Sequence, residues 1–145
     1  MTRIFTHQLE VRFRDCDAMG HVNNAVYLTY LEQARFAHWR ANGLARHTLD
    51  SAAAEGGGPA IPGVIVARVE IDYRRPAKHG DVLRVHLGVA AIGRTSFTYE
   101  YEIVDAADAL IAAARTVIVR FDYAAGRPVP ISEEIKEALT RNLLE

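Results

Sequence analysis

The sequence has a single cysteine, Cys16, among its 145 residues. One cysteine excludes an internal disulfide framework and a cysteine-rich metal site. Long apolar runs are also missing, because none approaches the roughly 18 residues that a membrane-spanning helix needs. Charge of one sign is not in excess: 17 basic and 18 acidic side chains leave a formal net charge of -1. Nucleic acids and acidic membranes are therefore unexpected partners.

The composition is typical of a globular protein, since half of the residues are apolar. A chain of this length and apolar content predicts a single domain over residues 1–145 with a true hydrophobic core. Residues 1–10 are charged and poor in apolar side chains, unlike a signal peptide. We therefore predict a cytoplasmic protein. The one low-complexity segment, residues 51–59, is rich in glycine and predicts a mobile surface loop.

The apolar periodicity changes from that of a strand to that of a helix near the N-terminus. Residues 9–13 alternate apolar and charged side chains, which predicts a first strand with one buried face. Residues 24–41 have helical spacing, with most apolar side chains in one stripe. Asn23 or Asn24 is the expected N-cap of this helix, and Gly43 is its expected stop.

The second half of the chain alternates long β-rich runs with short separators. These runs predict four strands with hairpin-like antiparallel connections, over residues 64–73, 81–92, 95–104 and 109–123. Ser132 then precedes two glutamates and predicts the N-cap of a C-terminal helix. The order indicates an α+β fold in which the long helix fills the concave side of one antiparallel sheet.

The most informative segment, residues 14–25, joins the first strand to the long helix. It places an acid, Asp17, one tight turn before the helix start, and Gly20 permits that turn. A helix start presents unpaired backbone N–H groups that suit an oxygen becoming negative during a reaction. A carboxylate facing such donors predicts acyl transfer or hydrolysis.

Three segments together resemble the hotdog-fold acyl-CoA thioesterases of the 4-hydroxybenzoyl-CoA thioesterase type. These are residues 11–28, 71–81 and 126–131, in the order that the family has them. The first segment is similar to the family's Asp-x-x-Gly-x-Val motif, with Asp17 at the position of the catalytic carboxylate. Its His-Val-Asn-Asn ending also resembles acyl carrier protein thioesterases, but those have an asparagine where Met19 stands. An asparagine-assisted mechanism is therefore not expected.

The resemblance implies a hotdog fold, a long antiparallel sheet wrapped around a central helix, and a hydrolase that releases acid and thiol from acyl-CoA. It also implies a homodimer with active sites at the subunit interface, often paired again into a homotetramer. No cofactor is expected, since coenzyme A is part of the substrate, and no metal is expected. Two questions stay open: which acyl chain is hydrolysed, and whether it is carried by coenzyme A or by a carrier protein.

Thioester hydrolysis can proceed with one carboxylate, because the departing thiol has a pKa of about 8.5 and leaves as thiolate. Asp17 is the predicted nucleophile or general base. The backbone N–H groups of Asn24 and Ala25 are the predicted oxyanion donors. His21 is a candidate to orient water or the carbonyl, with a backbone hydrogen bond as its ordinary alternative. The candidate substrate-binding residues are Asn23, Tyr27, Val66, Arg68 and Arg75.

Other chemistries fit the pattern less well. Cys16 lacks the histidine partner of a thiol nucleophile and is expected to be a small buried side chain. Asp15 and Asp17 mimic a calcium loop, but Met19 cannot coordinate and Val26 stands in place of the bidentate glutamate. The glycines at 56–58 lack the lysine of a phosphate loop.

Two rival functions stay open. A hotdog hydratase or dehydratase would use His21 and Asp17 as a coupled pair on an enoyl or 3-hydroxyacyl thioester, without releasing thiol. A non-catalytic acyl-thioester binding protein would only detect a metabolite, as a subunit or scaffold.

Overall fold

The computed structural model describes residues 3–44 and 63–145. Five strands form one antiparallel sheet in the order β1-β3-β4-β5-β2, and the two-residue β6 pairs with β5. The elements are β1 (Phe5–Glu10), η1 (Phe13–Asp15), α1 (Val26–Ala41), β2 (Val64–Tyr73), β3 (Val82–Ile92), β4 (Ser96–Val104), β5 (Leu110–Asp122), β6 (Arg127–Pro128) and α2 (Glu133–Thr140). The predicted loop at 51–59 lies outside the described residues.

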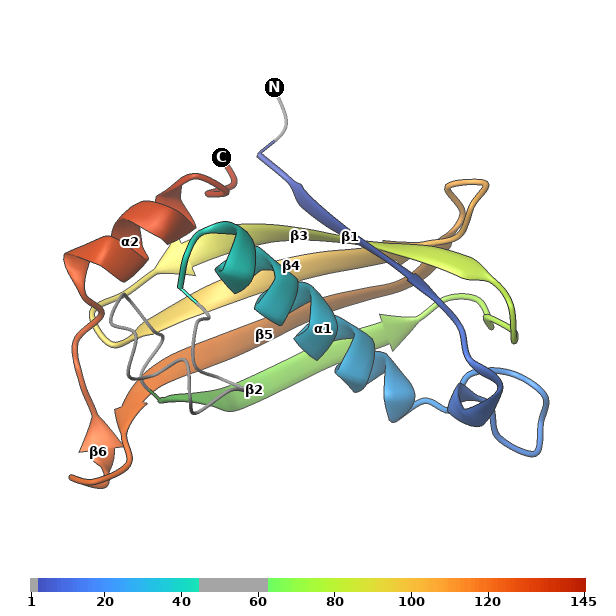
Figure 1. The fold of residues 1–145 in the computed structure, drawn as a ribbon, viewed down its shortest axis with the longest axis horizontal. Helices are drawn as coiled ribbons and strands as arrows, with labels where there is room; N and C mark the ends of the chain where they lie inside the picture. Colours follow the sequence, from blue (N-terminus) through green and yellow to red (C-terminus); the bar gives the residue numbers. More distant parts are fainter. Residues whose placement is uncertain (1–2, 45–62) are drawn as a thin grey trace.

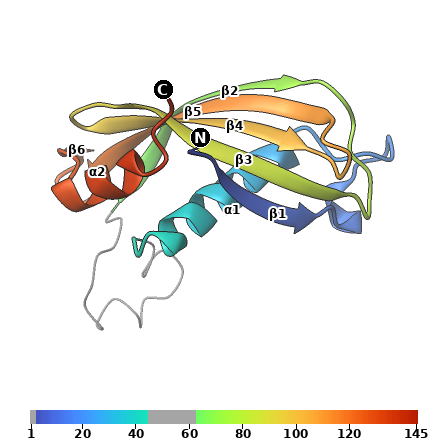
Figure 2. The same ribbon diagram turned by 90° about the horizontal axis from the view of Figure 1, so that it is seen from above.

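α1 lies along one face of the sheet, which confirms the predicted hotdog arrangement (Figures 1 and 2). Its buried face packs against apolar side chains that alternate along β3 and β4, such as Leu87 and Tyr101. Burial of this single continuous cluster is the main favourable contribution to folding. α2 lies near the end of the sheet where β3 connects to β4 (Figure 1). Leu144, four residues after α2, lies against Gly88 of β3.

The core under α1 contains polar side chains that satisfy one another. His38 is fully buried between the Tyr99 hydroxyl at 3.0 Å and the Asn142 side-chain oxygen at 2.8 Å. The indole N–H of Trp39 donates to the same Tyr99 hydroxyl at 2.8 Å. Burial lowers the pKa of His38, so the imidazole stays neutral near pH 7. Arg35 is buried as well, although it is charged and lies among the apolar side chains of α1.

Several predicted boundaries need correction. The first strand ends at Glu10, and Phe13 lies in the short helix η1, where its side chain is 79% exposed. Alternation alone could not reveal this, because one turn of 3₁₀ helix also places polar residues between apolar ones. The 74–81 connection is not a hairpin, since β2 and β3 lie apart in the sheet, but the β3–β4 and β4–β5 connections are.

Both ends of α1 also refine the prediction. Neither asparagine is the N-cap, because Ala25 occupies that position. Gly43 does follow the helix end, and its φ of 72° is the left-handed conformation that favours glycine. At the C-terminal helix Ser132 is the N-cap as predicted, and its hydroxyl accepts from the Ile135 N–H.

Candidate active site

The segment between η1 and α1 is a closed turn. The Asp17 N–H donates to the His21 carbonyl and the Gly20 N–H donates to the Asp17 carbonyl, both at 3.0 Å. Gly20 has a φ of 87°, which a side chain would strain, so the predicted need for glycine here is confirmed. Val22 is tied to the β2–β3 connection, since its N–H donates to the Ala77 carbonyl at 2.9 Å. The turn is therefore held in a defined position.

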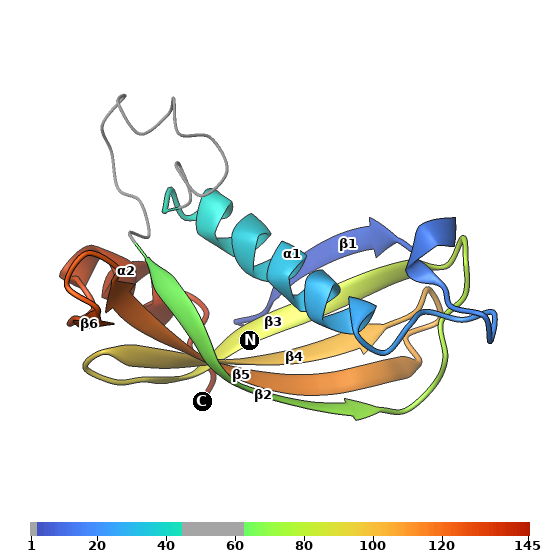
Figure 3. The same ribbon diagram turned by 90° about the horizontal axis from the view of Figure 1, so that it is seen from below.

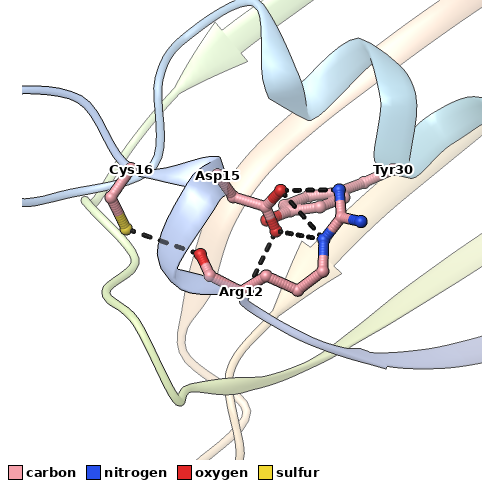
Figure 4. Close-up of polar contacts among 4 residues, drawn as sticks. All are labelled: Arg12, Asp15, Cys16 and Tyr30. Atoms are coloured by element: carbon pink, nitrogen blue, oxygen red, sulfur yellow. Dashed lines mark hydrogen bonds and ion pairs between the residues drawn. The ribbon is translucent and has the colours of Figure 1, made fainter.

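Asp15 anchors this turn to the rest of the fold (Figure 4). It is 2% exposed, and its carboxylate accepts from the Arg12 backbone N–H at 2.9 Å and from the Arg12 guanidinium at 2.9 Å. The Tyr30 hydroxyl, from the second turn of α1, donates to the same carboxylate at 2.7 Å. The Asp15 carbonyl accepts from the Asn23 N–H at 2.9 Å. One residue thus links the chain before the turn, the chain after it, and the helix.

The electrostatics of Asp15 agree with a permanent anion. Burial raises the pKa of this carboxyl, but the hydrogen bonds from Arg12 and Tyr30 lower it by more, so the net pKa lies below the ordinary value. Burial and the neighbouring carboxylate raise the pKa of Tyr30, which keeps its hydroxyl protonated as a donor. The motif resemblance singled out Asp17, but nothing in the sequence predicted that Asp15 is the buried anchor.

Asp17 has a different environment two residues later. It is half-buried, and one carboxylate oxygen accepts from the Met19 N–H at 2.9 Å in an Asx turn. The other oxygen has no hydrogen-bond partner within residues 3–44 and 63–145. This side chain lines a cleft of about 390 Å³. One oxygen is therefore oriented by the backbone and the other is available to chemistry.

The cleft gathers five of the residues named from the sequence: Asp17, His21, Asn24, Tyr27 and Arg75. Its remaining lining comes from Val22 and from the end of β2 and the connection after it, namely Tyr73, Arg74 and Pro76. Basic side chains thus lie at the same opening as the acid.

Tyr73 was not predicted in the site. Its hydroxyl donates to the Asn24 carbonyl at 2.8 Å, and its ring lies 5.4 Å from that of Tyr27, centroid to centroid. The contact joins the end of β2 to the start of α1, so it helps to shape the cleft. In the sequence, Tyr73 stands directly before Arg74, Arg75 and Pro76. That position could have suggested a role in the site, but no rule of sequence analysis places this segment beside the start of α1.

One of the two predicted oxyanion donors at the helix start is open. The Ala25 N–H donates to the Asn23 side-chain oxygen at 2.9 Å, so it is already engaged. The Asn24 N–H has no acceptor within the described ranges, and Asn24 lines the cleft. Of the two predicted oxyanion donors, Asn24 is the one that the local hydrogen bonding leaves open.

Three predicted substrate-binding residues lie outside this cleft. Asn23 is half-buried and is engaged with Ala25. Val66 lines a neighbouring cleft between α1 and β2. Arg68 projects from β2 and forms an ion pair with Glu70 at 2.6 Å. None of the three lines the cleft that holds Asp17.

His21 and Cys16 have local contacts. The His21 Nδ1 lies 3.3 Å from the Val22 carbonyl oxygen, the backbone contact expected as its ordinary alternative, although the residue also lines the cleft. The Cys16 thiol points to the Arg12 carbonyl at 3.9 Å (Figure 4). Across the described part of the chain, no group of three or more His, Cys, Asp or Glu side chains could hold a metal ion. No helix there is long and apolar enough to cross a membrane.

Comparison with known proteins identifies the family. Residues 11–139 match the model of the thioesterase-like superfamily, so the chain belongs to that family. It is 29% identical over 93% of its length to the 1,4-dihydroxy-2-naphthoyl-CoA hydrolase of Synechococcus elongatus, and covers 94% of that protein. It is 24% identical over 92% of its length to the acyl-CoA thioester hydrolase YbgC of Escherichia coli, again covering 94% of that protein.

A solved structure supports the same assignment. A thioesterase of Thermus thermophilus, determined in complex with coenzyme A and zinc, is 34% identical to this chain. The TM-score is 0.73, over 95% of this chain and 92% of the other. The predicted membership and the predicted hotdog fold are thereby confirmed, and the predicted enzyme class agrees with the names of these relatives.

Proposed function

We propose that this protein is an acyl-CoA thioesterase that uses Asp17 as nucleophile or general base. The observation that carries the proposal is that Asp17 and Asn24 line one cleft, while one Asp17 oxygen and the Asn24 N–H have no partner among the described residues. Family membership and the names of the relatives support the reaction class. The exposed Arg74 and Arg75 at the cleft suit the phosphates of coenzyme A.

The general-base route uses one water molecule. Asp17 takes a proton from the water, whose oxygen attacks the thioester carbonyl carbon. The carbonyl oxygen becomes negative and accepts a hydrogen bond from the Asn24 N–H. The C–S bond then breaks, and coenzyme A leaves as a thiolate that takes up the proton. In the nucleophilic route, the Asp17 oxygen attacks the carbonyl carbon, the C–S bond breaks and coenzyme A leaves as a thiolate. Water then hydrolyses the mixed anhydride, which releases the acid, restores the Asp17 carboxylate and supplies the proton that the thiolate takes up.

The first test measures thiol release from a panel of acyl-CoA substrates. We expect Asp17→Asn to lower kcat/KM by roughly 100- to 10,000-fold, the usual contribution of a general base. Asp122→Asn is the matched control. Asp122 also accepts backbone N–H groups in a turn, from Ala124 and Ala125, but does not line the cleft with Asp17.

The outcome also separates the rival functions. Thiol release at equal rates by wild type and Asp17→Asn would remove Asp17 from the mechanism. A hydratase would convert an enoyl thioester without any free thiol, and a binding protein would leave every substrate intact. Two further points stay predictions: the enzyme needs no cofactor, and it is located in the cytoplasm.

We also propose a homodimer, with a dimer of dimers as its further assembly. β2 is an edge strand, paired with β5 alone in the described part of the sheet. Its apolar side chains Val66, Val69 and Tyr73 are 42%, 40% and 45% exposed. An edge with apolar side chains invites pairing with another chain. Sedimentation at micromolar concentration tests this, and a stable folded monomer would contradict it.

A further inference from the structure

Two clefts are each lined by residues of both α1 and β2. The cleft with Asp17 is lined by Tyr27 of α1 and Tyr73 of β2. The next cleft is lined further along both elements, and its full lining is Leu28, Thr29, Leu31, Glu32, Arg35, Val66, Val69 and Thr116. From the first cleft to the second, residue numbers rise along α1 and fall along β2, so the two clefts follow each other along what we call the α1–β2 seam, the open space between these elements. Figure 3 shows α1 and β2 running in opposite directions.

A β-bulge gives the seam its continuous apolar wall. The pairing of β2 with β5 shifts between Val66 and Arg68, so Val66 lies opposite Ile118 and Val69 lies opposite Thr116. Ile118 and Thr116 are two residues apart on one face of β5. Val66 and Val69 therefore share a face, although their odd spacing would place them on opposite faces of a regular strand.

Arg35 lies in this second cleft without an acidic partner. It is 6% exposed, yet it forms no ion pair within residues 3–44 and 63–145. The one protein acceptor of its five N–H donors there is the Tyr101 hydroxyl at 3.2 Å. Tyr101 is itself engaged with Thr116 at 2.6 Å. The Arg35 nitrogens without a protein partner are not closed off from the cleft, so an acceptor on a bound molecule can reach them.

Glu32 lines the same cleft one turn earlier on α1, and it does not pair with Arg35. The cleft therefore presents unused donors and a carboxylate acceptor above an apolar wall. A hydroxyl group satisfies both, because its oxygen accepts from the guanidinium and its hydrogen donates to the carboxylate. A methyl group satisfies neither, and a second carboxylate would accept from Arg35 but would bring a like charge to Glu32 and offer it no donor.

We propose that Arg35 and Glu32 select acyl groups that carry a hydroxyl at the end far from the thioester. This inference rests on the proposed function, with the thioester carbonyl at the Asn24 amide. Arg35 lies eleven residues beyond Asn24, which is roughly 16 Å along a helix, and a side chain that leans back one turn shortens the span to roughly 11 Å. An extended eight-carbon acyl chain with a terminal hydroxyl spans this length.

The test compares three substrates of equal length: octanoyl-CoA, 8-hydroxyoctanoyl-CoA and octanedioyl-CoA. For the wild type we expect kcat/KM to be roughly 10- to 100-fold higher for the hydroxylated chain than for octanoyl-CoA, because the latter leaves polar groups unpaired. Arg35→Gln should reduce this ratio to within about threefold. Arg40→Gln, an exposed arginine on the same helix, should leave the ratio unchanged.

Glu32→Gln provides an independent arm, since it should raise the rate on octanedioyl-CoA relative to the hydroxylated substrate. If Arg35→Gln does not fold, Arg35→Lys replaces it, because lysine keeps the positive charge and has fewer N–H donors. This variant should retain part of the preference for 8-hydroxyoctanoyl-CoA over octanoyl-CoA. Equal wild-type rates on octanoyl-CoA and 8-hydroxyoctanoyl-CoA, or an unchanged ratio in both Arg35 variants, would overturn the inference and leave the proposed function standing. No thiol release from any of the three would overturn both.

Discussion

Two carboxylates lie two residues apart in the same segment and have opposite environments. Asp15 faces the interior, where Arg12 and Tyr30 hold both of its oxygens. Asp17 faces the cleft, where a single backbone N–H holds one oxygen. The comparison shows that the buried acid has hydrogen bonds on both oxygens, whereas the acid at the cleft keeps one oxygen without a partner among the described residues. The first fixes the turn, and the second is left free by it.

Asp15→Asn should have the largest effect on stability. It removes the charge that Arg12 and Tyr30 complement in a buried position, which should lower the free energy of unfolding by roughly 2–3 kcal/mol. We also expect kcat to fall, since the turn that carries Asp17 loses its anchor. Urea unfolding and thiol release measure the two effects. Asp17→Asn provides the contrast, because it should lose activity with little change in unfolding free energy.

The pH dependence of that stability difference sharpens the comparison. The pKa of Asp15 is lowered in the folded state, so its contribution is complete above the ordinary aspartate pKa of about 3.9 and is lost as pH falls toward the folded value. The gap between wild type and Asp15→Asn should therefore be constant near pH 7 and shrink below about pH 4, by at most roughly 1.4 kcal/mol per pH unit. A gap that widens in acid would contradict a charged Asp15.

Tyr30→Phe should have the smallest effect. It removes one donor to Asp15 and leaves the Arg12 ion pair in place, so we expect a loss of about 1 kcal/mol in unfolding free energy. Thermal unfolding measures it. A loss as large as that of Asp15→Asn would mean that the link to α1, rather than the pair with Arg12, carries the anchoring.

Much of the fold could be read from local patterns. The bounds of β2 were predicted to the residue, and those of β3, β4 and β5 within one residue, because β-rich runs alternate with short polar separators. The failures are equally local. Phe13 follows the alternation of a strand but lies in a single 3₁₀ turn. Asn23 carries the chemistry of an N-cap, but its side chain bonds to Ala25 just before the helix begins.

The candidate site could be predicted only in its contiguous part. Asp17, His21 and Asn24 share one motif, and the structure brings them into one cleft. Tyr73 joins them from β2 through a hydrogen bond across 49 positions of the chain. Arg68 and Arg75 are the same residue type, but Arg68 pairs with Glu70 and only Arg75 lines the cleft. Which arginine faces the cleft depends on strand register and on the connection, and neither is written in residue type.

By itself the sequence determined the order of the elements, the turn at Gly20 and the acid before the helix, since these depend on contacts between near neighbours. The tertiary structure decided which acid is buried and which has a free oxygen, and which arginine of α1 is buried with no ion pair among the described residues. The reason is physical: burial and hydrogen-bond partners set the energy of a charge, and part of both comes from residues distant in the chain, such as Tyr30 for Asp15 and Tyr101 for Arg35.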